Sequence, residues 1–126
     1  MKDRIRAYIA SPYTNGDKQK LTDLQVEAAA ELLKLGFNTF TPLLSHYISI
    51  FAKDMDDFPW LEVDIEWLKL CDLVVRIHPK DSDGNYIQSP GADEEEKYAN
   101  EHEIPLFHFD TIPEMIRYFQ RFQFEK

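Results

Sequence analysis

The sequence predicts an α/β fold with a parallel sheet, and three observations support this. Four short segments rich in β-branched and aromatic residues have the character of strands. A segment with helical periodicity follows each strand, and turn-forming residues separate the elements. This alternation aligns successive strands in parallel and places helices on both faces of the sheet. We therefore expect a single small Rossmann- or flavodoxin-like domain over residues 1–126, with four to five strands.

The first three elements have clear boundaries. Arg6 to Ala10 (RAYIA) is typical of a buried strand, and a run of turn formers ends it. From Lys18 to Leu35 the apolar residues recur at helical spacing, and Gly36 follows at the position of a C-cap glycine. Phe37 to Thr41 is then a second short strand, which Pro42 stops.

The alternation continues in the second half of the chain. Residues 43–55 are compatible with a short helix plus a loop. Residues 56–71 indicate a helix in which Asp57 is a plausible N-cap. The other expected elements are a strand at 72–77, a loop at 78–90, a helix at 91–103, a strand at 104–109 and a helix at 111–122.

Charge and cysteine content limit the classes of function. The formal net charge of −9 argues against nucleic acid and against an anionic membrane surface as partners. The single cysteine, Cys71, allows no internal disulfide and fits a reducing compartment. The first apolar run is too short for a signal peptide, and no segment is long enough to span a bilayer. We expect a cytoplasmic protein.

Parallel sheets bind ligands at the carboxyl ends of their strands. The segments that leave those ends are 11–17, 42–46 and 78–91. These segments supply candidate ligand contacts, among them Ser11, Tyr13 and His46.

Asp64 lies on the wrong side of its helix for a solvent-exposed acid. At about 100° per residue it falls opposite the polar stripe of Glu62, Glu66 and Lys69. A buried carboxylate is costly unless it is paired, hydrogen-bonded or protonated. Asp64 is therefore either a satisfied buried or interfacial acid or a functional one.

Four consecutive acids, Asp93 to Glu96, follow a Ser-Pro-Gly turn. Most of them can face water and favour the positive end of the helix dipole. Glu95, by contrast, lies on the side that would pack toward the sheet. This stripe of the helix comprises Ala92, Glu95, Ala99 and His102. Alone, Glu95 could be one more helix-start acid. With Asp64 it forms two inward-facing carboxylates near one sheet edge, as in acid and nucleophile pairs.

Three stretches resemble the nucleoside 2-deoxyribosyltransferase-like superfamily. They are AYIASPY at 7–13, VDIEWLKLCDLVV at 63–75 and SPGADEEEKYA at 89–99. The superfamily includes deoxyribosyltransferases and 2′-deoxynucleoside 5′-monophosphate N-glycosidases. The resemblance spans roughly residues 7–109 and implies an enzyme that cleaves or transfers an N-glycosidic bond of a small nucleoside or nucleotide. It also implies a homodimer or larger assembly.

The resemblance implies a role for each matching residue. Glu95 falls on the nucleophile that forms a covalent glycosyl-enzyme, and Asp64 falls on the acid that assists departure of the base. Tyr8 falls on a tyrosine that orients the nucleophile. Ser89 and Gly91 fall on the turn that holds the 5′ end of the sugar.

Several expectations stay open at this stage. Trp60 could form a wall of a nucleobase pocket or a dimer contact, whereas Trp67 is expected in the core. We expect no cofactor and no metal, because the histidines lack a recognisable ligand spacing. Ser89 favours a 5′-monophosphate donor, but the first loop lacks the arginine of the glycosidases. Transfer and hydrolysis both remain compatible, and the alternative is a catalytically weak nucleotide-binding or sensing module.

Overall fold

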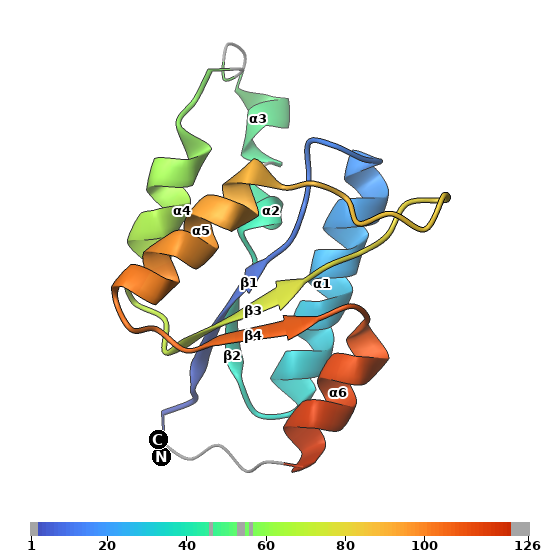
Figure 1. The fold of residues 1–126 in the computed structure, drawn as a ribbon. Helices are drawn as coiled ribbons and strands as arrows, with labels where there is room; N and C mark the ends of the chain where they lie inside the picture. The colour runs from blue at the N-terminus through green and yellow to red at the C-terminus, as the bar shows by residue number, and fades with distance from the viewer. Residues whose placement is uncertain (1–2, 46, 53–54, 56, 122–126) are drawn as a thin grey trace.

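A computed structural model describes residues 3–45, 47–52, 55 and 57–121 of the chain (Figure 1). Within these residues, four parallel strands form one sheet in the order β2-β1-β3-β4. The strands are β1 (Arg6–Ala10), β2 (Asn38–Phe40), β3 (Leu73–Ile77) and β4 (Leu106–Phe109). The helices are α1 (Lys18–Lys34), α2 (Pro42–Ser45), α3 (Ile48–Phe51), α4 (Trp60–Leu68), α5 (Pro90–Glu101) and α6 (Ile112–Arg121). The predicted Rossmann-like α/β fold is confirmed.

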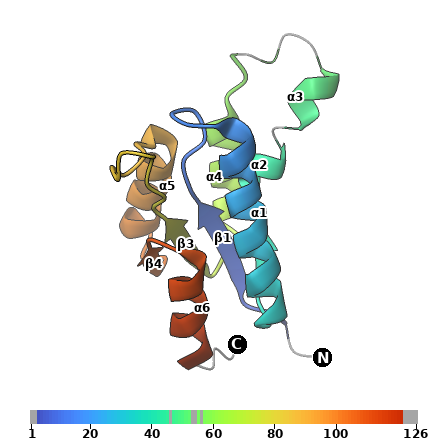
Figure 2. The same cartoon turned by 90° about the vertical axis from the view of Figure 1, so that its right-hand side faces the viewer.

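The sheet lies between two layers of helices, as Figures 1 and 2 show. Side chains alternate between the two faces along each strand. On one face Ile9 and Val75 pack with residues of α1 and α6, and on the other Tyr8 and Val74 pack with residues of α4 and α5. The central strand β3 is buried along its whole length. None of the helices in the described part of the chain is long and apolar enough to be a membrane span.

Local signals explain where the first long helix begins and ends. The side chain of Asp17 accepts a hydrogen bond from the backbone N–H of Lys20, which caps the start of α1. After the last turn Gly36 has φ of +102°, a conformation that favours glycine, and the chain turns into β2. Both boundaries match the sequence prediction to within a residue.

The start of α4 differs from the prediction. Asp57 is not its N-cap, because α4 begins at Trp60, directly after Pro59, and no side-chain hydrogen bond caps it. The fixed φ of proline and its missing N–H suit it to this position at a helix start.

The order of the strands fixes where a ligand site can form. β2 pairs with one side of β1, and β3, which comes later in the chain, pairs with the other side of β1. The carboxyl ends of β1 and β3 therefore flank a switch point, where open α/β sheets have a crevice. The loop after β1 and the start of α5 both lie at this edge of the sheet (Figure 1).

Candidate active site

A cavity of about 150 Å³ lies at the switch point of the sheet. All of the predicted site residues line it except Tyr8, which lies beneath it in β1, and His46, which lies outside the described residues. The lining residues are Ser11, Tyr13, Thr14, Gln25, Pro42, Leu43, Trp60, Leu61, Asp64, Ser89, Gly91, Ala92 and Glu95. The structure thus brings together residues from five separate segments of the chain.

Glu95 is hydrogen-bonded to a tyrosine of the first strand. The Tyr8 hydroxyl donates a hydrogen bond to Oε2 of Glu95, and both side chains are buried. Burial, and then the negative charge of Glu95, raise the pKa of Tyr8 well above its ordinary value. The hydroxyl therefore stays protonated and acts as a donor to the carboxylate.

Asp64 reaches the same cavity from α4. It is 8% exposed, and its Oδ1 is buried with no hydrogen-bond partner among the described residues. Burial raises the pKa of Asp64 to about 7. An unpartnered buried carboxyl favours its neutral, protonated form.

The two carboxyls influence each other. Burial raises the pKa of Glu95 to about 8, and the charge of Asp64 adds to this rise. The hydrogen bond from Tyr8 and the positive charge of Arg76 act in the opposite direction. Near neutral pH, the pair can therefore hold one proton between its two members, as in known acid and nucleophile pairs.

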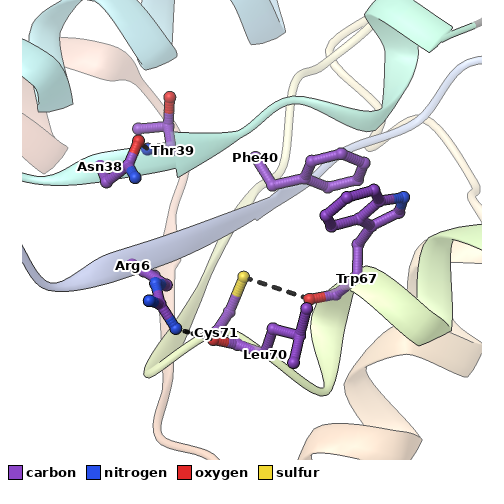
Figure 3. A pocket seen from close by; sticks show the side chains of 7 residues that line it. All are labelled: Arg6, Asn38, Thr39, Phe40, Trp67, Leu70 and Cys71. Carbon is purple, nitrogen blue, oxygen red and sulfur yellow. Dashed lines mark hydrogen bonds between the residues drawn. The ribbon is translucent and has the colours of Figure 1, made fainter.

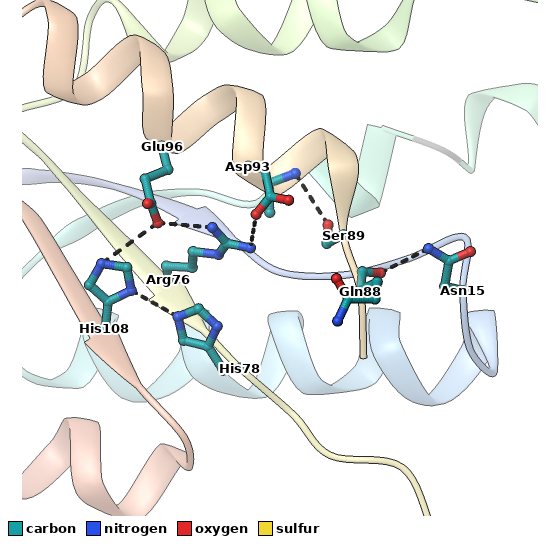
Figure 4. Close-up of polar contacts among 9 residues, drawn as sticks. Asn15, Arg76, His78, Gln88, Ser89, Asp93, Glu96 and His108 are labelled. Atoms are coloured by element: carbon teal, nitrogen blue, oxygen red, sulfur yellow. Dashed lines mark hydrogen bonds and ion pairs between the residues drawn. The ribbon is translucent and has the colours of Figure 1, made fainter. Parts of the chain in front are cut away.

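The turn before α5 forms the rim of the cavity. The buried Ser89 Oγ accepts a hydrogen bond from the backbone N–H of Ala92, which caps the helix. Asn15, in the loop after β1, donates a hydrogen bond to the carbonyl of Gln88, so the two loops are joined beside the cavity (Figure 4). A Cβ on Gly91 would meet no atom within 4 Å, so there is open space above this turn.

Sequence reasoning missed Gln25, which is fully buried in α1. Its Nε2 donates to Ser11 Oγ at 2.8 Å, and its Oε1 accepts from the backbone N–H of Leu43 at 2.9 Å. Gln25 therefore fixes the segments that follow β1 and β2 relative to each other. The available signal was a polar residue one turn after Leu21, on the apolar stripe of this helix.

Two of the acids expected to face water also form ion pairs; Asp93 is 61% exposed, as expected, whereas Glu96 is only 30% exposed. Arg76 of β3 contacts Asp93 Oδ1 at 2.6 Å and Glu96 Oε1 at 2.8 Å (Figure 4). Beside this pair, His78 and His108 share a ring hydrogen bond of 2.8 Å. Among the described residues, no group of three or more histidines, cysteines or acids could hold a metal ion.

A second, larger hollow of about 330 Å³ lies at the amino ends of β1 and β2 and contains none of the predicted site residues (Figure 3).

The expectation that Trp67 packs in the core is wrong. Its side chain is 50% exposed and stacks on Phe40 with ring centroids 5.3 Å apart, while Leu68 takes the core position. Burial raises the pKa of the neighbouring Cys71 thiol to about 11.

The fold and the cavity together define a class: a parallel α/β protein with two buried carboxyls at its switch point. Neither family models nor curated proteins give a match to the chain. Among solved structures, it is similar to the 2-deoxyribosyltransferase of the psychrotolerant bacterium Bacillus psychrosaccharolyticus, with a TM-score of 0.61 and 18% identity. The similarity covers 90% of this chain and 91% of that chain. The chain therefore has the nucleoside 2-deoxyribosyltransferase-like fold that the sequence motifs implied.

Proposed function

We propose that this protein cleaves or transfers the N-glycosidic bond of 2′-deoxynucleosides or their 5′-monophosphates. The observation that carries the proposal is that Glu95 of α5 and Asp64 of α4 line one small cavity, both buried. The fold similarity supports the same substrate class, because that relative is a 2-deoxyribosyltransferase described as a biocatalyst for nucleoside synthesis.

The chemistry runs in two steps. The Glu95 carboxylate attacks the anomeric carbon, the bond from that carbon to the base nitrogen breaks, and Asp64 donates its proton to the leaving base. The product is a glycosyl ester on Glu95. In the second step, water or the nitrogen of another base attacks the same carbon and releases Glu95. The Asp64 carboxylate accepts the proton that the attacking group loses.

This scheme requires an ionised Glu95 and a protonated Asp64. Burial raises the pKa of both, and of Glu95 further than of Asp64. We nevertheless place the shared proton on Asp64, because only Glu95 has groups that stabilise its ionised form. These are the Tyr8 hydroxyl and the charge of Arg76, whereas Oδ1 of Asp64 has no partner among the described residues.

The rim of the cavity offers contacts for the rest of the substrate. Ser89 Oγ already accepts one hydrogen bond, and its own hydrogen is available to donate to an oxygen at the 5′ end of the sugar. The backbone N–H of Gly91, in the first turn of α5, can donate a hydrogen bond to a hydroxyl or a phosphate at the same place. Tyr13 and Trp60 provide aromatic surface for a base.

The proposal also includes a homo-oligomer. Large apolar side chains on the short helix α3 are exposed, Phe51 by 89% and Ile48 by 54%. Exposed apolar surface of this kind is typical of a protein contact. Light scattering coupled to size exclusion measures the assembly directly, and a monomer at all concentrations would contradict this part.

The main test is release of free base. The protein is incubated with deoxynucleosides and their 5′-monophosphates, with and without a second base, and products are separated by chromatography. E95Q should abolish release and retain ligand binding, while E94Q, a change to the exposed neighbouring acid, should keep wild-type activity. Mass spectrometry should find the glycosyl adduct on the peptide that contains Glu95. Tight binding with no base release from any donor would instead indicate a nucleotide-binding module.

A further inference from the structure

Arg76 is a charged residue in the most buried strand of the protein. It is 8% exposed, although β3 is otherwise entirely apolar, and its partners across the sheet are Ala10 and His108. A buried guanidinium is costly unless carboxylates compensate it. Here Asp93 and Glu96 do so, at 2.6 and 2.8 Å, and both lie on the helix that carries Glu95.

The two ion pairs fix the rotation of α5 about its own axis. Residues three apart lie on one side of a helix, so Asp93 and Glu96 face the sheet at Arg76 together. Glu95 precedes Glu96 by one residue, which turns it by about 100° toward Tyr8 and the cavity. Rotation of α5 about its axis would break the ion pair of Arg76 with Asp93 or the one with Glu96. The two ion pairs therefore hold the Glu95 carboxylate in its direction toward the cavity.

Arg76 also supplies the positive charge in an acidic region. Four acids stand in a row in the first turns of α5, and the charge of Arg76 lowers the pKa of Glu95 against the effect of burial. The other titratable groups that face Glu95 are Tyr8 of β1 and Asp64 of α4. On the far side of Arg76, His108 of β4 lies 3.6 Å from Glu96, and His78 bonds to His108.

We propose that Arg76 is a positioning residue for the reaction of Glu95: it orients the nucleophile through Asp93 and Glu96 and offsets the negative charge of α5. It acts from outside the cavity, since it is not among the lining residues. This inference rests on the proposed function for its effect on rate. Its electrostatic part can be measured without any substrate.

The test compares R76Q, R76K and the double variant D93N/E96Q by pH profiles of kcat/KM for base release. Ionisation of Glu95 gives the limb that rises with pH. R76Q should move this limb to higher pH by about one unit. Its kcat/KM at pH 7 should then fall about tenfold, because a shift of one pH unit changes the ionised fraction of Glu95 about tenfold. D93N/E96Q should move it the opposite way, since two negative neighbours are lost while Arg76 keeps its charge. R76K should leave the limb near its wild-type position but lower kcat.

Matched controls separate this effect from loss of stability. K34Q breaks the exposed Lys34–Glu31 pair on α1 and should change neither limb nor rate. H108Q removes the imidazole beside Glu96, and the shift caused by R76Q should persist in the combined variant R76Q/H108Q. D93N alone removes the more exposed of the two partners and leaves the pair with Glu96 in place, so it serves as the folded variant if the others lose stability. Equal losses at every pH, with the limb unmoved in R76Q and in the double variant, would overturn the inference.

A substrate-free measurement distinguishes failure of this inference from failure of the proposed function. Carbon-13 NMR of labelled glutamate carboxyls follows the titration of Glu95, which is assigned by its absence in E95Q. We expect R76Q to raise this midpoint and D93N/E96Q to lower it, whether or not the wild-type protein releases base. An identical Glu95 titration in R76Q and wild type would overturn the inference even if base release is observed.

Discussion

Tyr8 on the first strand donates a hydrogen bond to Glu95 on α5, 87 residues further along the chain. The bond joins the centre of the sheet to the cavity at its edge. It uses one of the two carboxylate oxygens of Glu95. Burial, and then the negative charge of Glu95, raise the pKa of Tyr8, so its hydroxyl stays protonated. The contact therefore ties the orientation and the ionisation of Glu95 to the fold itself.

Removing this hydroxyl should slow base release. Y8F keeps the ring next to Phe40 but removes the donor to Glu95. We expect kcat at pH 7 to fall about tenfold to hundredfold, since a hydrogen bond to a charged group contributes about 1.5–3 kcal/mol. The rising limb of the pH profile should also move to higher pH. The control is Y86F, which removes a hydroxyl that donates to Asp110 outside the cavity. Equal pH profiles for Y8F and Y86F would contradict the role of Tyr8.

Neutralising Asp64 should stabilise the protein at high pH. The folded-state pKa of about 7 lies above the ordinary value of 3.8, so the folded state binds more protons than the unfolded state between these values. The penalty for ionising Asp64 is absent below about pH 4, grows as the pH rises from 4 to 7, and stays constant above that. D64N should therefore raise the free energy of unfolding at pH 8, by at most about 4 kcal/mol, and leave it unchanged near pH 4.

Urea denaturation at both pH values measures this effect. E62Q, on the exposed face of the same helix, should show no such pH-dependent gain. D64N should at the same time lose base release, as expected where a functional site costs stability. A D64N protein that is less stable than wild type at pH 8 would show that Asp64 has a stabilising partner in its ionised form.

The sequence predicted the features that depend on local pattern. The bounds of β1 and the end of α1 at Lys34, two residues before Gly36, follow from apolar periodicity and cap chemistry. The inward faces of two helices follow from the 3.6-residue period, which placed both Asp64 and Glu95 in buried positions. His102 departs from that stripe, because α5 ends at Glu101 and the His102 ring stacks on Tyr98 instead.

Features that depend on which elements meet in space could not be predicted. The partners of Arg76 are 17 and 20 residues away in the chain, and nothing local indicates which helix covers β3. Gln25 similarly joins two loops that become neighbours only in the folded sheet. The apolar character of Trp67 predicts a place in the core, but Leu68 packs with residues of the central strands instead. Trp67 stacks on Phe40 of the edge strand β2 and stays half exposed.

Filling the open space at Gly91 should weaken substrate binding without harming the fold. Its φ is not positive and an added Cβ meets no atom within 4 Å, so G91A should fold normally. The methyl group would occupy part of the cavity, and we expect KM to rise about tenfold, since overpacking costs about 1–3 kcal/mol. G36A is the matched control: with φ of +102° it should lose stability and keep KM. An unchanged KM in G91A would place the substrate elsewhere.

The two tryptophans allow a direct test of which hollow binds the substrate. Trp60 lines the cavity with the two carboxyls, and Trp67 lines the larger hollow at the other end of the strands. In W67F, which keeps only Trp60, a deoxynucleoside or its monophosphate should change the emission as the base stacks near the indole. In W60F the remaining emission should stay constant over the same concentrations. A change confined to W60F would assign nucleoside binding to the larger hollow, and the pair of carboxyls would then need another explanation.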